Sequence, residues 1–195
     1  MTDPLSSHAK RLRTKVRLAL QKHLDRVRET SLAIPVLGPG SGGGAEYDKR
    51  VQIRDALQAE GHFAYFPEDE LGTLPPSSRV YSTDTLEEGL FDSAEMIIMI
   101  AVPGGASHEL EQITANHKRL SDTLVFIDRS ARSSYVAKGT LHRMEHALGL
   151  LLWYEKPRDL DECNLLKVAM EEARLRQETK ARAIANAKSW GVEGT

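Results

Sequence analysis

The sequence predicts an α/β domain built on a doubly wound, five-stranded parallel sheet, with extra helices at both ends of the chain. Five short apolar runs alternate with segments of helical periodicity, the order expected when a helix joins each strand to the next. The runs are nearly continuous in Val, Ile, Leu and Met, as in strands buried on both faces. The length of 195 residues, with 41% hydrophobic and 28% charged residues, suits one globular domain.

The predicted elements follow one another in a regular order. A basic amphipathic helix comes first, at Ser7–Arg28. The five predicted strands are LAIPVLG (32–38), HFAYFPE (62–68), MIIMIAVP (96–103), TLVFID (123–128) and LLLWYE (150–155). The helices expected after them are Glu46–Glu60, Thr85–Ala94, Ala106–Leu120, Tyr135–Leu148 and Glu162–Lys188. This pattern favours a flavodoxin-like or Rossmann-like sheet over residues 31–160, between a basic helix within 1–30 and a charged helix within 161–195.

A loop is expected at Leu71–Thr83, where Pro75 and Pro76 stand among small polar residues. It would follow the second strand and so lie over the same end of the sheet as the other strand-to-helix loops. The segment is either a lid over a ligand or a plain surface connection.

The charge is close to neutral overall and strongly uneven along the chain. The formal net charge is −2, which gives no general attraction to nucleic acid or to anionic lipid. The first helix nevertheless has eight basic residues against one acidic residue: Lys10, Arg11, Arg13, Lys15, Arg17, Lys22, Arg26 and Arg28. Such a helix binds a nucleic acid or an acidic partner, or else simply presents a solvated face. The charged C-terminal helix suggests self-association, so we expect a homo-oligomer.

Cysteine content and hydrophobicity point to a cytoplasmic protein without a metal or cofactor. Cys163 is the single cysteine, which excludes an internal disulfide and any CxxC metal motif. No run of 18 apolar residues occurs, and the first thirty residues are polar and charged. We therefore expect no membrane association.

In doubly wound sheets, ligands bind outside the carboxyl ends of the strands, where the strand order reverses. The residues at the carboxyl end of each predicted strand, and those directly after it, are therefore the first candidates for a site. They are Gly38–Gly44, then Glu68, Asp69 and Glu70, then Pro103–Glu111, then Asp128 and Arg129, and finally Glu155 and Lys156.

The first glycine loop predicts a sugar contact better than a pyrophosphate cradle. Gly38, Gly40 and Gly43 formally match GxGxxG, but five glycines in seven residues make that match weak. The carboxylates after the second strand begin with Glu68, about 30 residues past Gly38, whereas a dinucleotide fold has its acidic ribose ligand about 20 residues beyond the motif. No P-loop motif occurs. Gly38, Pro39 and Gly40 would line a sugar, or serve as a flexible cover, while Tyr47 would stack on a base.

The loop after the third strand carries the stronger signal. In PGGASHELE, Gly104 and Gly105 allow the backbone to approach a ligand closely. Glu109 falls in the first turn of the expected helix, whose positive end keeps a carboxylate ionised and suited to attack an anomeric carbon. The competing interpretation is an ordinary stabilising acid at a helix start. His108 would orient the base or donate a proton, or be a polar surface residue.

Four segments together resemble the nucleoside 2-deoxyribosyltransferase-like superfamily, including its N-glycosidase-like members among bacterial antiphage effectors. The segments are PVLGPG, KRVQIRDALQAEGHFAYFPEDE, FDSAEMIIMIAVPGGASHELEQI and TLVFID, within about Leu32–Asp128. The resemblance implies that Gly38 and Pro39 line the sugar site, and that Glu109, in HEL, is the nucleophile. It further implies that acidic or polar groups after the second strand and before the third hold the base and the ribose, which matches Glu68, Asp69 and Asp84.

Two departures from that family's pattern favour hydrolysis over base exchange. Pro103 stands where the family has an Asp, and Glu111 stands where it has a small glycine. An alternative frame compares this loop with the PGGxGTxxE motif of phosphoribohydrolases related to lysine-decarboxylase-like proteins, and would promote Glu111. Ser107 and His108 replace the Gly-Thr pair of that motif, which favours Glu109.

The expected function is cleavage, or transfer, at the N-glycosidic bond of a nucleoside, nucleotide or NAD-like substrate, as in a defence effector. The alternative is a non-catalytic nucleotide-binding sensor or assembly module. A third hypothesis is an effector subunit that a nucleic-acid-containing partner holds inactive through the basic helix.

Overall fold

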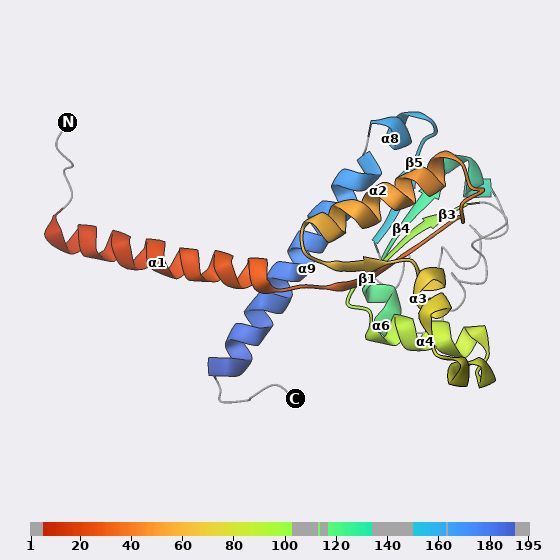
Figure 1. Ribbon diagram of the computed structural model, residues 1–195. Helices are drawn as coiled ribbons and strands as arrows, with labels where there is room; N and C mark the ends of the chain where they lie inside the picture. The colour runs from red at the N-terminus through yellow and green to blue at the C-terminus, as the bar shows by residue number, and fades with distance from the viewer. Residues whose placement is uncertain (1–5, 103–112, 114–116, 134–149, 163, 190–195) are drawn as a thin grey trace. The chain divides into compact units, whose positions relative to one another are not determined.

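Figure 1 shows the chain as a computed structural model, which describes residues 6–102, 113, 117–133, 150–162 and 164–189. The chain divides into two compact units. The α/β unit is Leu32–Arg174, and the helical unit combines Met1–Ser31 with Leu175–Thr195.

The α/β unit contains a five-stranded sheet in the order β2-β1-β3-β4-β5, and all four neighbouring pairs are parallel. The strands are β1 (Ala33–Leu37), β2 (Phe63–Tyr65), β3 (Ile97–Ala101), β4 (Thr123–Asp128) and β5 (Leu150–Tyr154). Their register places Val36 opposite Ile98, and Ile98 opposite Leu124. The predicted fold class, a doubly wound parallel sheet of the flavodoxin or Rossmann type, is confirmed.

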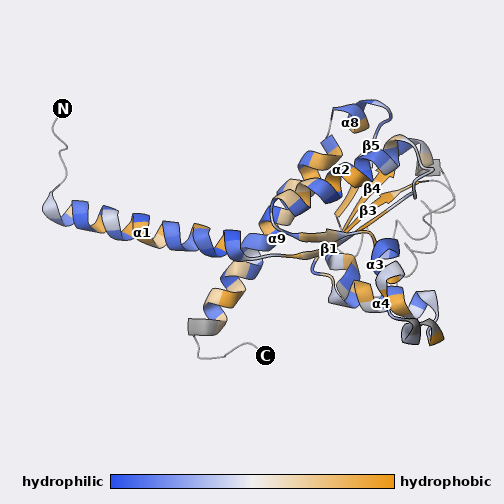
Figure 2. Ribbon diagram, in the orientation of Figure 1, coloured by the Kyte–Doolittle hydropathy of each residue, from blue (hydrophilic) through white to orange (hydrophobic). Residues whose placement is uncertain are grey.

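Helices cover both faces of the sheet, which explains why β3 and β4 are buried at every residue. On one face, α2 (Ala45–Ala59), α8 (Arg158–Asp161) and the start of α9 (Asn164–Ser189) share a core with the sheet. On the other face lie α4 (Thr83–Ser93) and α6 (His117–Ser121), which contribute Phe91 and Leu120. Figure 1 shows these two layers, and Figure 2 shows the apolar strands between them.

The segment predicted as a loop at Leu71–Thr83 is largely helical, so that prediction is wrong. Helix α3 (Pro67–Thr73) and the 3₁₀ helix η1 (Pro76–Val80) occupy most of it. Strand β2 is correspondingly shorter than expected, because Pro67 begins α3 directly after Phe66. A proline in the first helical turn loses no backbone hydrogen bond there, and Glu68, Asp69 and Glu70 favour the positive helix end.

Other predicted helices are described only in part. From the helix expected at Ala106–Leu120, the structure describes Ile113 and the residues that belong to α6. The helix expected at Tyr135–Leu148 lies outside the described residues, and β4 is followed by the 3₁₀ helix η2 (Arg129–Ser133).

The helical unit consists of α1 (Ser7–Glu29) and the second half of α9. The Ser6 hydroxyl caps α1 by accepting a hydrogen bond from the Ala9 N–H at 3.3 Å. After α1, the Thr30 carbonyl accepts a 2.8 Å hydrogen bond from Gln177, and the Ser31 carbonyl a 2.7 Å bond from Lys180. Among the described helices, none is both long enough and apolar enough to cross a membrane.

Candidate functional site

The strand order reverses between β1 and β3, so a ligand crevice is expected at the carboxyl ends of these two strands. The chain leaves β1 through the glycine loop Gly38–Gly44, and it leaves β3 through Val102. The predicted nucleophile Glu109 and its neighbours Gly104, Gly105 and His108 lie outside the described residues. The described part of the site is therefore the β1 side and the ends of β4 and β5.

The glycine loop is held close to the sheet at its start and is tightly packed within. A Cβ atom on Gly38, where φ is +147°, would lie 3.1 Å from the Ile100 carbonyl oxygen of β3. A Cβ atom on Gly43 would lie 2.3 Å from the Cβ of Pro39. In contrast, Gly40 has open space where a Cβ would be. The loop is thus a compact turn with an open side, rather than a uniformly loose segment.

Arg50 of α2 holds the start of this loop through hydrogen bonds. Its side chain is buried, with the residue only 1% exposed, and its Nε donates to the Val36 carbonyl at 2.8 Å. Its Nη1 donates to the Pro39 carbonyl at 3.3 Å. Both Nη atoms bind the carboxylate of Glu68, at 2.6 and 2.7 Å, and the guanidinium lies 4.1 Å from the centre of the Phe66 ring. One buried arginine therefore connects the end of β1, the glycine loop and the first turn of α3.

The charge of Glu68 is stabilised by that arginine. Partial burial raises the pKa of Glu68. Hydrogen bonds from Arg50 and from the backbone, together with the positive charge of Arg50, lower the pKa by more than burial raises it, so the net shift is downward. Glu68 is thus an ionised carboxylate whose side chain is half exposed to solvent.

The other predicted ligands on this side lie on neighbouring elements. Asp69 is exposed on α3, and one of its oxygens lies 3.9 Å from an Nη atom of Arg54. Tyr47 is half-buried on α2, with its ring centre 6.4 Å from that of Phe66. Asp84 is exposed in the first turn of α4, a helix that contacts α3. The structure brings Tyr47, Glu68 and Asp69 to one neighbourhood around Phe66, while Asp84 lies on the adjoining helix.

A second group of charged residues meets at the ends of β4 and β5. Glu46, in the first turn of α2, and Asp128, the last residue of β4, are both buried acids. The ammonium of Lys156 contacts the Glu46 carboxylate and lies 3.2 Å from a carboxylate oxygen of Asp128. The hydroxyl of Tyr154 donates to Glu46 at 3.5 Å. We refer to Glu46, Asp128, Tyr154 and Lys156 as the lysine cluster.

The lysine cluster contains both hydrogen-bond donors and hydrogen-bond acceptors. Burial, with a contribution from the negative charge of Asp128, raises the pKa of Tyr154, so this phenol remains a donor at neutral pH. The backbone N–H of Ser130 also donates to Asp128, at 2.9 Å. Two carboxylates against one ammonium leave a formal excess of negative charge, which suits ligand hydroxyl groups or a ligand cation.

Sequence reasoning found only part of this cluster. Asp128 ends one predicted strand and Lys156 directly follows another, so the strand-end rule placed them among the candidates. Glu46 was missed, because its contact with Tyr154 depends on how α2 packs on the sheet.

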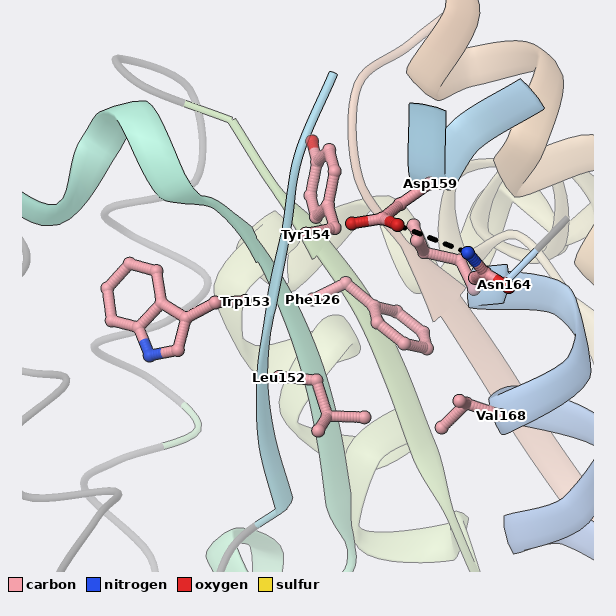
Figure 3. A pocket seen from close by; sticks show the side chains of 8 residues that line it. Phe126, Leu152, Trp153, Tyr154, Asp159, Asn164 and Val168 are labelled. Carbon is pink, nitrogen blue, oxygen red and sulfur yellow. Dashed lines mark hydrogen bonds between the residues drawn. The ribbon is translucent and has the colours of Figure 1, made fainter. Parts of the chain in front are cut away.

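An apolar cavity of about 190 Å³ lies between β5 and the start of α9. Figure 3 shows Phe126, Leu152 and Val168 around it, with the hydrogen-bonded pair Asp159 and Asn164 to one side. The Trp153 side chain points to the other side of β5. The ring of Tyr154 lines this cavity while its hydroxyl belongs to the lysine cluster. No sequence pattern indicated the cavity.

Within the described ranges, no group of three or more His, Cys, Asp or Glu side chains is arranged to hold a metal ion. No protein-family model matches the sequence, and no curated protein matches it.

Proposed function

We propose that the protein cleaves the N-glycosidic bond of a nucleoside, nucleotide or NAD-like substrate at the carboxyl ends of β1 and β3. The observation that carries this proposal is the buried Arg50, which joins the glycine loop to the acidic first turn of α3 at this end of the sheet. A preorganised loop and ionised carboxylates beside a switch point are suited to a sugar with several hydroxyl groups.

In the proposed reaction, the Glu109 carboxylate attacks the anomeric carbon as the bond from that carbon to the base nitrogen breaks. The base leaves with the bonding electrons and takes up a proton. Water then attacks the same carbon, and the Glu109 carboxylate is released. Hydrolysis therefore yields free base and free sugar, whereas transfer would require a second base in place of water.

The described residues would bind the substrate. Glu68 and Asp69 would accept hydrogen bonds from ribose hydroxyls, and Tyr47 would stack on the base. Gly38, Pro39 and Gly40 would pass close to the sugar. Asp84, one helix further, would contact the base edge. The proposed setting is the cytoplasm, as a defence effector or a related nucleotide-consuming enzyme.

The alternative is a nucleotide-binding sensor or assembly module, which the exposed basic helix α1 favours because it offers a surface for a partner. To separate the two, the purified full chain is incubated with individual nucleosides, nucleotides and NAD, and free base is measured by mass spectrometry. Free base formed in proportion to protein concentration supports the enzyme. Ligand binding measured by calorimetry without base release supports the sensor.

A further inference from the structure

Helix α1 has an apolar stripe that its own unit leaves open. Of its 23 residues, none is buried. Leu12, Val16, Leu20 and Leu24 follow one another at intervals of four, so they lie along one side of the helix, and all four are exposed. Figure 2 shows short apolar stretches along an otherwise polar α1. Because most of the stability of a helix in a protein comes from packing of its amphipathic face, a surface that covers the stripe would stabilise α1.

That surface should be acidic as well as apolar. With eight basic and two acidic residues, Ser7–Glu29 carries a formal charge of +6. The basic residues border the apolar stripe on both sides. A partner that covers the stripe therefore also meets this positive charge.

The chain itself contains a surface with both properties. The acidic surface, Pro67–Ser93, comprises α3, η1 and α4, and its seven acidic residues and one arginine give a formal charge of −6. It is −3 when three arginines that pair with it, Arg50, Arg54 and Arg119, are added to the sum. Its apolar residues Leu74, Val80 and Tyr81 are exposed, Val80 to 81%.

We propose that α1 of one molecule docks on the acidic surface of a second copy. The two surfaces have opposite formal charge, and each has exposed apolar side chains. If each molecule gives its α1 and receives the other, the contact closes as a two-fold dimer. The proposal does not depend on base release.

A second copy fits the stripe better than other anionic partners. A phosphate backbone would neutralise the basic residues but leave Leu12, Val16 and Leu20 in water. A lipid surface would cover the stripe, but α1 contains no Trp, Tyr or Phe, the residues that anchor interfacial helices. An acidic protein surface with exposed apolar residues meets both requirements.

The test measures the mass of the full chain by sedimentation over a range of concentrations around about 10 µM, at low and high salt. The key variants are Leu20→Glu, on the stripe, and Leu18→Glu, its matched control. The two leucines are 55% and 58% exposed, and they lie on opposite sides of the helix because neighbours two apart are about 200° apart. We expect a dimer for the wild type and for Leu18→Glu, and at least about tenfold weaker association for Leu20→Glu.

The receiving surface is tested with Val80→Glu and with charge reversals. Val80→Glu should weaken the dimer as Leu20→Glu does. Arg17→Glu on α1 and Glu88→Arg on the acidic surface should each weaken it as well. High salt should dissociate the wild-type dimer.

Several results would overturn the proposal. They are a wild-type monomer at all concentrations, equal effects of Leu18→Glu and Leu20→Glu, or a complex that nuclease treatment disperses. Base release by a fully monomeric protein would support the enzymatic function and contradict the proposed dimer.

Discussion

At the scale of single residues, Arg50 is the most informative side chain in the described part of the site. It is a buried cation with two backbone carbonyls and one carboxylate as partners. Its removal leaves the Val36 and Pro39 carbonyls without this donor, and unsatisfied buried polar groups cost about 1–3 kcal/mol each. Arg54, one turn further along α2, offers a matched comparison, since its guanidinium also lies 4.2 Å from the centre of the Phe66 ring.

We predict that Arg50→Met lowers the free energy of unfolding by about 3 kcal/mol, while Arg54→Met lowers it by less than about 1 kcal/mol. Both variants lose a contact with Phe66, so their difference compares the buried hydrogen bonds and the Glu68 pair of Arg50 with the more exposed acidic partners of Arg54. Urea titration followed by circular dichroism measures both values. Equal losses in the two variants would show that Arg50 contributes only through the aromatic ring.

The pairing of Glu68 predicts a specific pH dependence. Because the folded pKa of Glu68 lies below its unfolded value of about 4.3, its ionised form stabilises the fold above that unfolded value. This contribution is lost as the pH falls through the folded pKa. The stability difference between wild type and Glu68→Gln should thus be constant from about pH 5 to 7 and shrink at lower pH. A difference that grows on acidification would contradict the assigned direction.

These residue roles were only partly predictable. A lysine or arginine within an amphipathic helix pattern is normally assigned to the solvated face, so nothing in the sequence marked Arg50 as buried. Glu68 was predicted as a site residue from its place after the second strand. Its fixed pairing with Arg50 requires knowledge of how α2 packs on the sheet.

At the scale of elements, the glycine loop contains positions with opposite demands. At Gly43 an added Cβ would collide with Pro39, whereas at Gly42 it would find no atom within 4 Å. The loop must shift to accommodate a side chain at Gly43, whereas it can accommodate one at Gly42 without moving.

Gly43→Ala should therefore destabilise the protein by about 1–3 kcal/mol and Gly42→Ala by less than about 0.5 kcal/mol. Thermal and urea unfolding of the two variants, each compared with wild type, measure the difference. If both variants unfold like the wild type, the close packing of Gly43 on Pro39 plays no part in stability.

Helix α3 was not predicted, although its sequence contains the signal of a helix start. PEDELGT has a proline in the first turn followed by three acids, which is a typical helix start. The prolines and serines after it favoured a loop, because such clusters usually mark irregular structure. A short helix without apolar periodicity is recognised by its N-terminal residues rather than by its faces.

At the scale of the whole molecule, the parallel sheet was predictable because its strands are apolar on both sides and separated by helical segments. The hydrophobic periodicity and the length of each segment are sufficient to recognise that pattern. The lysine cluster was not predictable as a unit, since Glu46 and Lys156 are 110 residues apart in the sequence and meet only in the folded chain. The topology thus predicted the end of the sheet where charged residues gather, but not their partners.

The central claim is that Glu109 is the nucleophile of a base-releasing reaction. Glu109→Gln and Glu111→Gln are matched changes two residues apart, and the competing motif would assign the role to Glu111. With the substrate found by mass spectrometry, base release should fall by several orders of magnitude in Glu109→Gln and stay near the wild-type rate in Glu111→Gln. A wild-type rate in Glu109→Gln, with the fold intact by circular dichroism, would contradict the account.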